Sequence, residues 1–264
     1  MLSSRVRLTV ALFVCAVFLG TTAQASVIGI NFIGNCPANA DQVGSNQAGL
    51  EAQTHWNDLN YWNDGTNLMA SDGGSTSVKA TIGATTQGYA GYVAIPAANA
   101  GNYLLIRGYL HAGGSVWTVT LTNLTSEYTP GGYDLIVYYD GNNNSADWVT
   151  EFALSSGSTT LASVFAKDAT DTATWSGTFV QATGTSAATA TDGNYVRFTG
   201  LTADSLTLTT TPESGDGPIN GIQIVAVPEP AALALLSLGL AATLARRRQT
   251  QPGRHRRRTQ PPGL

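Results

Sequence analysis

The sequence predicts an all-β protein, a single β-sandwich or jelly roll of about eleven short strands between two targeting segments. Short runs rich in Val, Ile, Tyr, Phe, Trp and Thr recur along the chain. Gly, Asn, Asp and Pro separate these runs, and amphipathic helical periodicity is nearly absent. A closed barrel is the structural alternative, because it would show the same strand pattern.

The individual runs differ in what they predict. Residues Val116–Leu124 alternate apolar with polar side chains, as in a strand with one buried face. Tyr133–Tyr139 is apolar on nearly both faces and predicts a central strand. Leu50–Asp64 predicts a loop with one helical turn. The expected strands are Val27–Phe32, Ser77–Ile82, Tyr103–Tyr109, Val116–Leu124, Tyr133–Tyr139, Trp148–Leu154, Leu161–Phe165, Thr174–Gln181, Tyr195–Phe198, Ser205–Leu208 and Ile219–Val225.

The N-terminus reads as a secretory signal peptide over residues 1–25. Arg5 and Arg7 precede the apolar run Leu8–Leu19, and Ala23-Gln24-Ala25 provides small residues for cleavage between Ala25 and Ser26. An uncleaved anchor is the alternative. The folded body is then one domain over residues 26–227, since no repeat or linker divides it.

Charge and cysteine content limit what the body does. It contains 16 acidic residues but only four basic ones, Lys79, Arg107, Lys167 and Arg197. Such a body offers no basic patch for phosphate backbones, which excludes nucleic acid as a partner. Once the signal peptide is removed, Cys36 is the single cysteine, so an intramolecular disulfide is excluded and the core alone must stabilise the fold.

The C-terminal region combines a short polar motif, an apolar run and a basic cluster. Pro228-Glu229-Pro230 precedes the run Ala231–Ala245, which Arg246, Arg247 and Arg248 follow. As a helix the run would be about 22 Å long, short for a permanent span of the bilayer. The arginines place the C-terminus in the cytoplasm and the body outside. Residues 249–264 predict a disordered basic tail.

This arrangement over residues 228–248 resembles the PEP-CTERM sorting signal of Gram-negative bacteria, with a short transmembrane helix. The resemblance implies an exosortase-type transpeptidase as a partner, transient anchoring in the inner membrane, and transfer to the cell surface or an extracellular matrix, often with exopolysaccharide. The same segment is also known as the C-terminal domain of ice-binding proteins, a label that describes only the tail. A plain single-pass anchor is the alternative.

The body resembles bacterial exported β-sandwich modules of the galactose-binding-like, carbohydrate-binding type. The resemblance lies in structural motifs and implies no defined ligand site. Its segments are Asn31–Gly34, Ala52–Asn57, Tyr133–Gly141, Asn194–Phe198 and Asn220–Val225.

A candidate calcium site follows the central strand. Asp140, Asn142 and Asn144 place oxygens at alternate positions, and Asp147 could add a carboxylate. The pattern lacks the Gly and the bidentate Glu of a complete EF-hand loop. A polar turn is the alternative, since Asn, Asp and Gly favour turns for conformational reasons.

A candidate glycan site lies in the preceding polar segment, where Trp56, Tyr61 and Trp62 occur among Asn and Asp residues. Aromatic rings can stack on sugars while amides and carboxylates bind hydroxyl groups. The alternative is that these rings cover one end of the core.

The sequence contains no Gly-x-Ser-x-Gly, His-Glu-x-x-His or P-loop motif. We therefore predict a non-enzymatic, exported protein with a binding or structural role, associated with polysaccharide. The alternative is a surface glycan hydrolase using carboxylates such as Asp134 and Glu151. Ice adsorption is disfavoured, because Thr-x-Thr alternation occurs only in short stretches, such as residues 118–122, 170–174 and 207–211.

Overall fold

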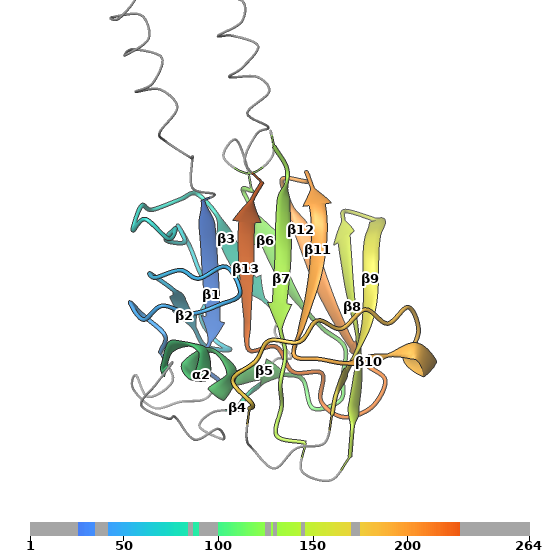
Figure 1. The fold of residues 1–264 in the computed structure, drawn as a ribbon. Helices are drawn as coiled ribbons and strands as arrows, with labels where there is room; N and C mark the ends of the chain where they lie inside the picture. The colour runs from blue at the N-terminus through green and yellow to red at the C-terminus, as the bar shows by residue number, and fades with distance from the viewer. Residues whose placement is uncertain are drawn as a thin grey trace, which may run out of the picture. The chain divides into compact units, whose positions relative to one another are not determined.

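The computed structural model confirms the β-sandwich: two large sheets face each other (Figure 1). It describes residues 26–34, 42–83, 87–89, 100–124, 128, 131–143, 146–169 and 175–227. The predicted signal peptide, Cys36, the sorting segment 228–248 and the tail 249–264 lie outside these residues. In the described part of the chain there is one α-helix, and it is neither long nor apolar enough to cross a membrane.

The first sheet has five strands in the order β11-β7-β13-β1-β2. All neighbours are antiparallel except β1 and β2, which run parallel. Every residue of the three inner strands is buried, which confirms the central position predicted for Tyr133–Tyr139. Its strands are β1 (Val27–Phe32), β2 (Asn57–Leu59), β7 (Tyr133–Tyr138), β11 (Tyr195–Leu201) and β13 (Gly221–Ala226).

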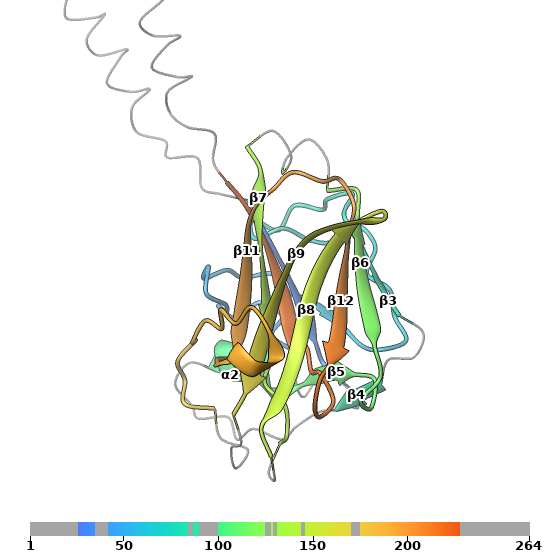
Figure 2. The same cartoon turned by 90° about the vertical axis from the view of Figure 1, so that its right-hand side faces the viewer.

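The second sheet has six strands in the order β10-β9-β8-β12-β6-β3. Only the β9–β10 pair is parallel. A small sheet of β4 (Gln87–Tyr89) and β5 (Tyr109–His111) lies at one end of the sandwich (Figure 2). The strands of the second sheet are β3 (Lys79–Ile82), β6 (Trp117–Thr122), β8 (Trp148–Ser156), β9 (Thr159–Asp168), β10 (Thr191–Asp192) and β12 (Leu206–Pro212).

The main core fills the space between the sheets. Strand β6 shows the pattern: Trp117, Val119 and Leu121 are buried, while the threonines between them are partly exposed. On β8, Phe152 and Leu154 join the same cluster. Full burial of each large apolar side chain contributes about 1.5–3 kcal/mol, so this layer stabilises the fold without a disulfide.

The outer face of the first sheet carries a second apolar cluster. Helix α2 (Ala100–Arg107), the loop 42–56 and the segment 175–182 cover this face. This second layer explains why the inner strands are apolar on both faces. The cluster consists of Val27, Val43, Ala48, Trp56, Leu105, Ile106, Ile136, Tyr138, Trp175, Tyr195 and Val225.

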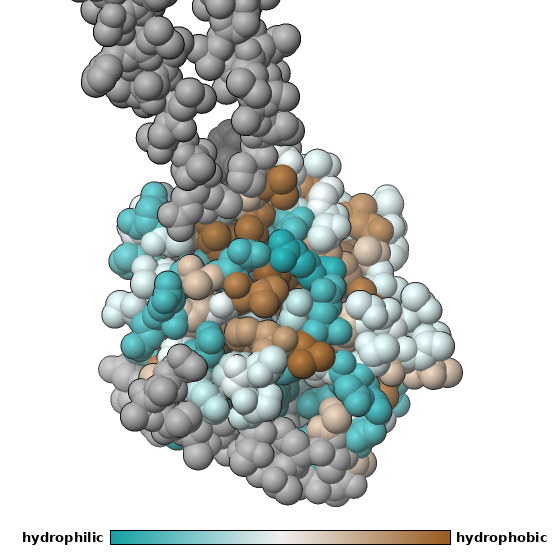
Figure 3. Space-filling view, in the orientation of Figure 1, coloured by the Kyte–Doolittle hydropathy of each residue, from teal (hydrophilic) through white to brown (hydrophobic). Residues whose placement is uncertain are grey.

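Polar contacts attach the loop 42–56 to the sheet beneath it. Gln223 Nε2 donates to the Glu51 carbonyl at 2.7 Å, and Tyr138 donates its hydroxyl to Gln223. Arg197 lies 2.7 Å from Asp134 and 3.3 Å from Glu51. Figure 3 shows polar residues mixed with apolar ones over this face of the molecule.

Two predicted strands are wrong. Residues predicted as the strand Tyr103–Tyr109 form most of α2, which ends at Arg107 before β5 begins. The helix buries Leu105 and Ile106 against the first sheet, and this contact decides between helix and strand for a short apolar run. The described part of Thr174–Gln181 is extended but forms only one bridge, at Gln181.

Segment Leu50–Asp64 also differs from its prediction. It contributes β2, which pairs with β1, where a loop with a helical turn was expected. Asp58 on β2 accepts hydrogen bonds from Asn31 and from the backbone N–H groups of Val43 and Gly44 at 2.7–3.0 Å. Burial raises the pKa of the Asp58 carboxyl, and these three hydrogen bonds oppose the rise.

Candidate functional sites

The predicted calcium loop begins at the end of β7. Asp140 is buried, and its backbone carbonyl accepts a hydrogen bond from Asn220 Nδ2 at 3.0 Å. Asn142 donates from Nδ2 to the Tyr89 hydroxyl at 3.0 Å. These contacts attach the loop to neighbouring parts of the body.

The other predicted ligands give no closed site. Asp147 lies 3.3 Å from Lys167, which also pairs with Asp192 at 2.7 Å. Asn144 lies outside the described residues. Among the residues that the structure describes, no group of three or more His, Cys, Asp and Glu side chains could hold a metal ion. Calcium binding stays a prediction.

The three predicted glycan-binding aromatics differ in their exposure. Trp56 is only 5% exposed and donates from Nε1 to the Gln53 carbonyl at 3.3 Å. Tyr61 packs against the main core. Trp62 is 58% exposed, and its ring centre lies 3.8 Å from that of Tyr61 at an interplanar angle of 67°. The buried Trp56 is therefore not part of a surface platform, and Trp62, with Tyr61 packed edge-on against it, is the exposed ring of the three.

The carboxylates named for glycan hydrolysis lie on opposite outer faces. Asp134 is on β7, where the alternate residues Tyr133 and Leu135 point into the main core. Glu151 is on β8 of the other sheet, next to Phe152 in that core. Because both sheets lie between them, the structure does not bring this pair together.

The two histidines of the described body have different partners: His55 contacts a hydroxyl and a carbonyl, and His111 contacts a carboxylate. His55 Nδ1 lies 3.1 Å from the Ser71 carbonyl and 3.0 Å from Thr54 Oγ1. His111 lies at the β4–β5 end, with Nδ1 3.4 Å from Asp216 Oδ2. The Gly113 N–H donates to the same Nδ1 at 3.2 Å, a contact that only the unprotonated nitrogen accepts.

We expect His111 to make stability depend on pH. Burial lowers its pKa below the ordinary value of 6.5, although Asp216 acts in the opposite direction. The unfolded chain therefore binds the proton more tightly, and stability falls as pH drops through 6.5 towards the folded-state pKa. Urea unfolding at pH 7.5 and 5.5 should show this loss, and His111→Gln should reduce it. The interpretation is wrong if His55→Gln reduces the dependence equally.

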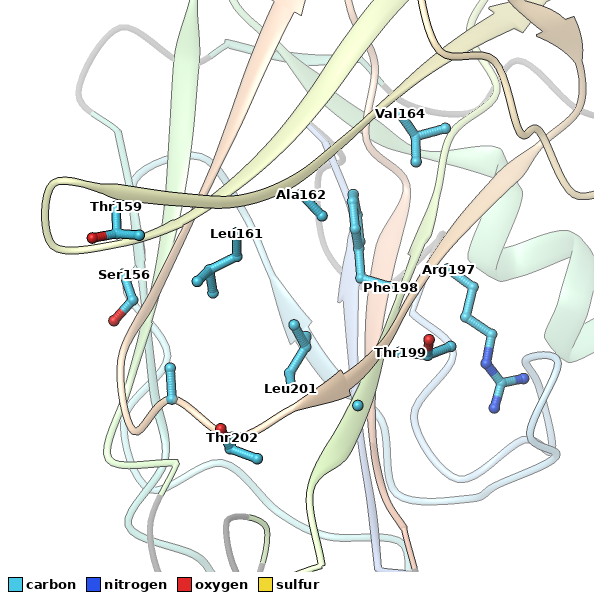
Figure 4. A pocket seen from close by; sticks show the side chains of 12 residues that line it. Ser156, Thr159, Leu161, Ala162, Val164, Arg197, Phe198, Thr199, Leu201 and Thr202 are labelled. Atoms are coloured by element: carbon cyan, nitrogen blue, oxygen red, sulfur yellow. The ribbon is translucent and has the colours of Figure 1, made fainter.

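A groove opens along one side of the sandwich, between β9 and β11. Its volume is about 720 Å³. Leu161, Ala162 and Val164 line it from β9, and Phe198 and Leu201 line it from β11 (Figure 4). Hydroxyl groups occupy its rim, at Ser156, Thr159, Thr199 and Thr202. No motif in the sequence marks this groove, because it forms where two strand edges distant in sequence approach each other.

Arg197 is the charged residue at the groove. Its guanidinium turns towards Asp134 and Glu51 on the outer face of the first sheet. Asp134 also accepts a hydrogen bond from the Gly200 N–H at 3.0 Å. The carboxylates hold the pKa of Arg197 above its usual range, so the group stays charged and paired. The groove therefore presents an apolar floor and a neutral, hydroxyl-bearing rim.

A solved structure to which the chain is similar is a distant one. An exo-β-1,3-galactanase from Phanerochaete chrysosporium, determined with galactose, aligns at a TM-score of 0.28 and 14% identity. The alignment covers 57% of this chain and 30% of the galactanase chain. A likeness this weak supports no argument about fold or activity. No curated protein matches the sequence.

The C-terminal segment matches a known protein motif. Residues 226–249 match the PEP-CTERM protein-sorting motif. The match begins at Ala226, the last residue of β13, and includes Pro228, Glu229, Pro230 and the arginines 246–248. Since this motif is the recognition signal for exosortase, the chain is an exported protein with a PEP-CTERM sorting signal directly after its β-sandwich.

Proposed function

We propose that the β-sandwich has a non-catalytic binding or structural role at the cell surface or in the extracellular matrix, in association with polysaccharide. The observation that supports this role is the position of the sorting motif. It starts at the last residue of β13, so processing at Pro228–Pro230 would release a body with all its strands complete.

Trp62 is the proposed contact for polysaccharide. Its indole is exposed beside Asn63 and Asp64, which are exposed as well. Aromatic rings with one apolar face and polar neighbours suit the apolar face of a sugar ring and its hydroxyl groups. The buried Trp56 and the partly buried Tyr61 would then support the loop from beneath. A surface glycan hydrolase is the alternative, and no contact among the described residues favours it.

We expect the full-length protein, purified in a mild detergent, to be retained by at least one polysaccharide of a panel that includes the host's exopolysaccharide. Trp62→Ala should weaken retention about tenfold or more, because truncating an anchoring aromatic residue costs roughly 2 kcal/mol. Trp62→Phe should keep most of the binding. Val180→Ala, another exposed apolar position, should change nothing.

The same panel separates the two functions. Retention without release of new reducing ends supports the binding role. Release of reducing ends that a single carboxylate substitution abolishes would establish the hydrolase instead. Retention that is equal in the wild type and in Trp62→Ala would exclude Trp62 as the sugar contact.

A further inference from the structure

The two sheets leave a seam between β9 and β11 that the chain itself closes over half its length. Near β10, Gln181 bridges Tyr195 at the start of β11, and Gly184 bridges Phe165 on β9. A 3-10 helix, Ala187–Thr189, follows before β10 pairs with β9 (Figure 2). Near the β8–β9 hairpin, from Leu161 to Val164, the described part of the chain places no backbone segment in the seam. That open half is the groove lined by Leu161, Val164, Phe198 and Leu201.

The closed half shows how the seam accepts a strand. Ala182 donates its N–H to the Tyr195 carbonyl at 2.9 Å, so the chain pairs with the first residue of β11. Phe165 donates its N–H to the Gly184 carbonyl at 2.9 Å, so the same segment then reaches β9. The contacts are between backbone groups, which an extended peptide of almost any sequence can make.

The backbone of β9 continues this edge into the open half. Backbone groups alternate between the two sides of a strand, so Ser163 presents its N–H and carbonyl to the same side as Phe165. At Phe165 that side is occupied by Gly184. At Ser163 the described part of the chain supplies no backbone partner on that side. An added strand would find unpaired donors and acceptors there.

The edge of β9 between Ala162 and Phe165 is less protected than the edges of β2, β3 and β11. Strand β2 has only three residues, and β3 carries Lys79. Strand β11 is interrupted by an irregularity between Phe198 and Leu201, where Gly200 has a φ of +67°. Short length, lysine and bulges all discourage pairing with a further strand. Strand β9 has ten residues and leaves Leu161 43% exposed. It has an irregularity of its own at Leu161, opposite Leu154 and Ser155 of β8, but its pairing is regular from Ala162 to Asp168. It contains no charge from Thr159 to Ala166.

We propose that the open half of the seam binds an extended, uncharged peptide strand of a partner polypeptide, which adds to the edge of β9 between Leu161 and Phe165. Backbone hydrogen bonds to Ser163 fix the strand. Its alternate side chains are small or apolar and pack on Leu161 and Leu201. Charged peptides are disfavoured, because Arg197 is paired with Asp134 and Glu51 and the rest of the lining is neutral.

The test uses the full-length protein in mild detergent and a fluorescent, end-capped heptapeptide of alternating Thr and Val. We expect it to bind, and we expect a peptide with a central proline not to bind. Ser163→Pro removes the outward N–H and should weaken binding about fivefold or more, whereas Ser163→Ala keeps that N–H and should bind within about twofold of the wild type. If Ser163→Pro does not fold, Leu161→Lys replaces it, since an edge lysine should weaken binding similarly, and Leu161→Met is its control.

Three results would overturn the proposal. The first is failure of the Thr-Val peptide to bind the wild type. The second is equal binding by the folded Ser163→Pro and Leu161→Lys variants. The third is binding of a glucan hexasaccharide that these substitutions abolish, which would make the groove a sugar site. The proposal is independent of the polysaccharide contact, so Trp62→Ala should bind the peptide like the wild type.

Discussion

Replacing Pro228, Glu229 and Pro230 by alanine is expected to leave the protein uncleaved at the inner membrane. The tripeptide belongs to the matched sorting motif, while the apolar run Ala231–Ala245 and the arginines after it remain to hold the chain in the bilayer. Exosortase would lose its recognition element but the anchor would persist. Cell fractionation followed by immunoblotting against the body should show the longer form in the inner membrane and loss of the surface form.

The matched control replaces Thr250, Gln251 and Pro252, which lie just beyond the motif, by alanine. This variant should be processed and delivered like the wild type. Deletion of the exosortase gene should reproduce the effect of the tripeptide substitution. Normal surface delivery of the tripeptide variant would show that this motif does not direct sorting in the protein.

Substitution of Leu121 by alanine is expected to lower the free energy of unfolding much more than the same substitution at the exposed Leu161. Leu121 on β6 is 1% exposed and lies in the main core, between its cross-strand neighbours Ala80 and Leu206. Removing a buried leucine side chain costs about 2–5 kcal/mol, because the apolar contact is lost and a cavity remains. Urea unfolding followed by tryptophan fluorescence measures this as a shift of the midpoint at constant slope.

Leu161→Ala is the control, since it makes the same chemical change in the same sheet. Leu161 is substantially exposed, so its substitution should alter stability by about 0.5 kcal/mol or less. Equal losses in the two variants would contradict the assignment of β6 to the core and of Leu161 to the groove. A changed slope in either variant would indicate an altered unfolded state.

Much of the fold could be predicted from local patterns. The alternation in Val116–Leu124 placed Trp117, Val119 and Leu121 on the core side of β6, and the structure confirms it. The run Tyr133–Tyr139, apolar on nearly both faces, predicted an inner strand, and β7 is an inner strand of the first sheet. Such predictions succeed because side chains alternate across a strand with a period of two, so the burial pattern is written directly into the order of residues.

Other elements depended on contacts between distant residues. The run around Leu105 was predicted as a strand but is helical, because the first sheet offers an apolar outer face for its Leu105 and Ile106. The strand β2 forms because Asn57–Leu59 finds β1 beside it. Short segments lack a period long enough to decide their conformation, so tertiary packing decides it.

The candidate sites, like the fold, could be predicted from the sequence only in part. The sequence marked the aromatic cluster, but only the structure separated the exposed Trp62 from the buried Trp56. The stretch from Thr159 to Ala166 carries no charge, which is a feature of an unprotected strand edge. This signal has meaning only when the strands beside β9 are known. Nothing local indicates that β11 lies opposite.

The sequence by itself determined that the protein carries a sorting signal, because the tripeptide, the apolar run and the arginine cluster form a linear motif over residues 226–249. It also determined the all-β class, because strand periodicity is local. Only the tertiary structure decided which rings are exposed, that Asp134 and Glu151 lie on opposite outer faces, and where the open edge of β9 lies. Those properties depend on strand order, and strand order is set by the packing of residues far apart in the chain.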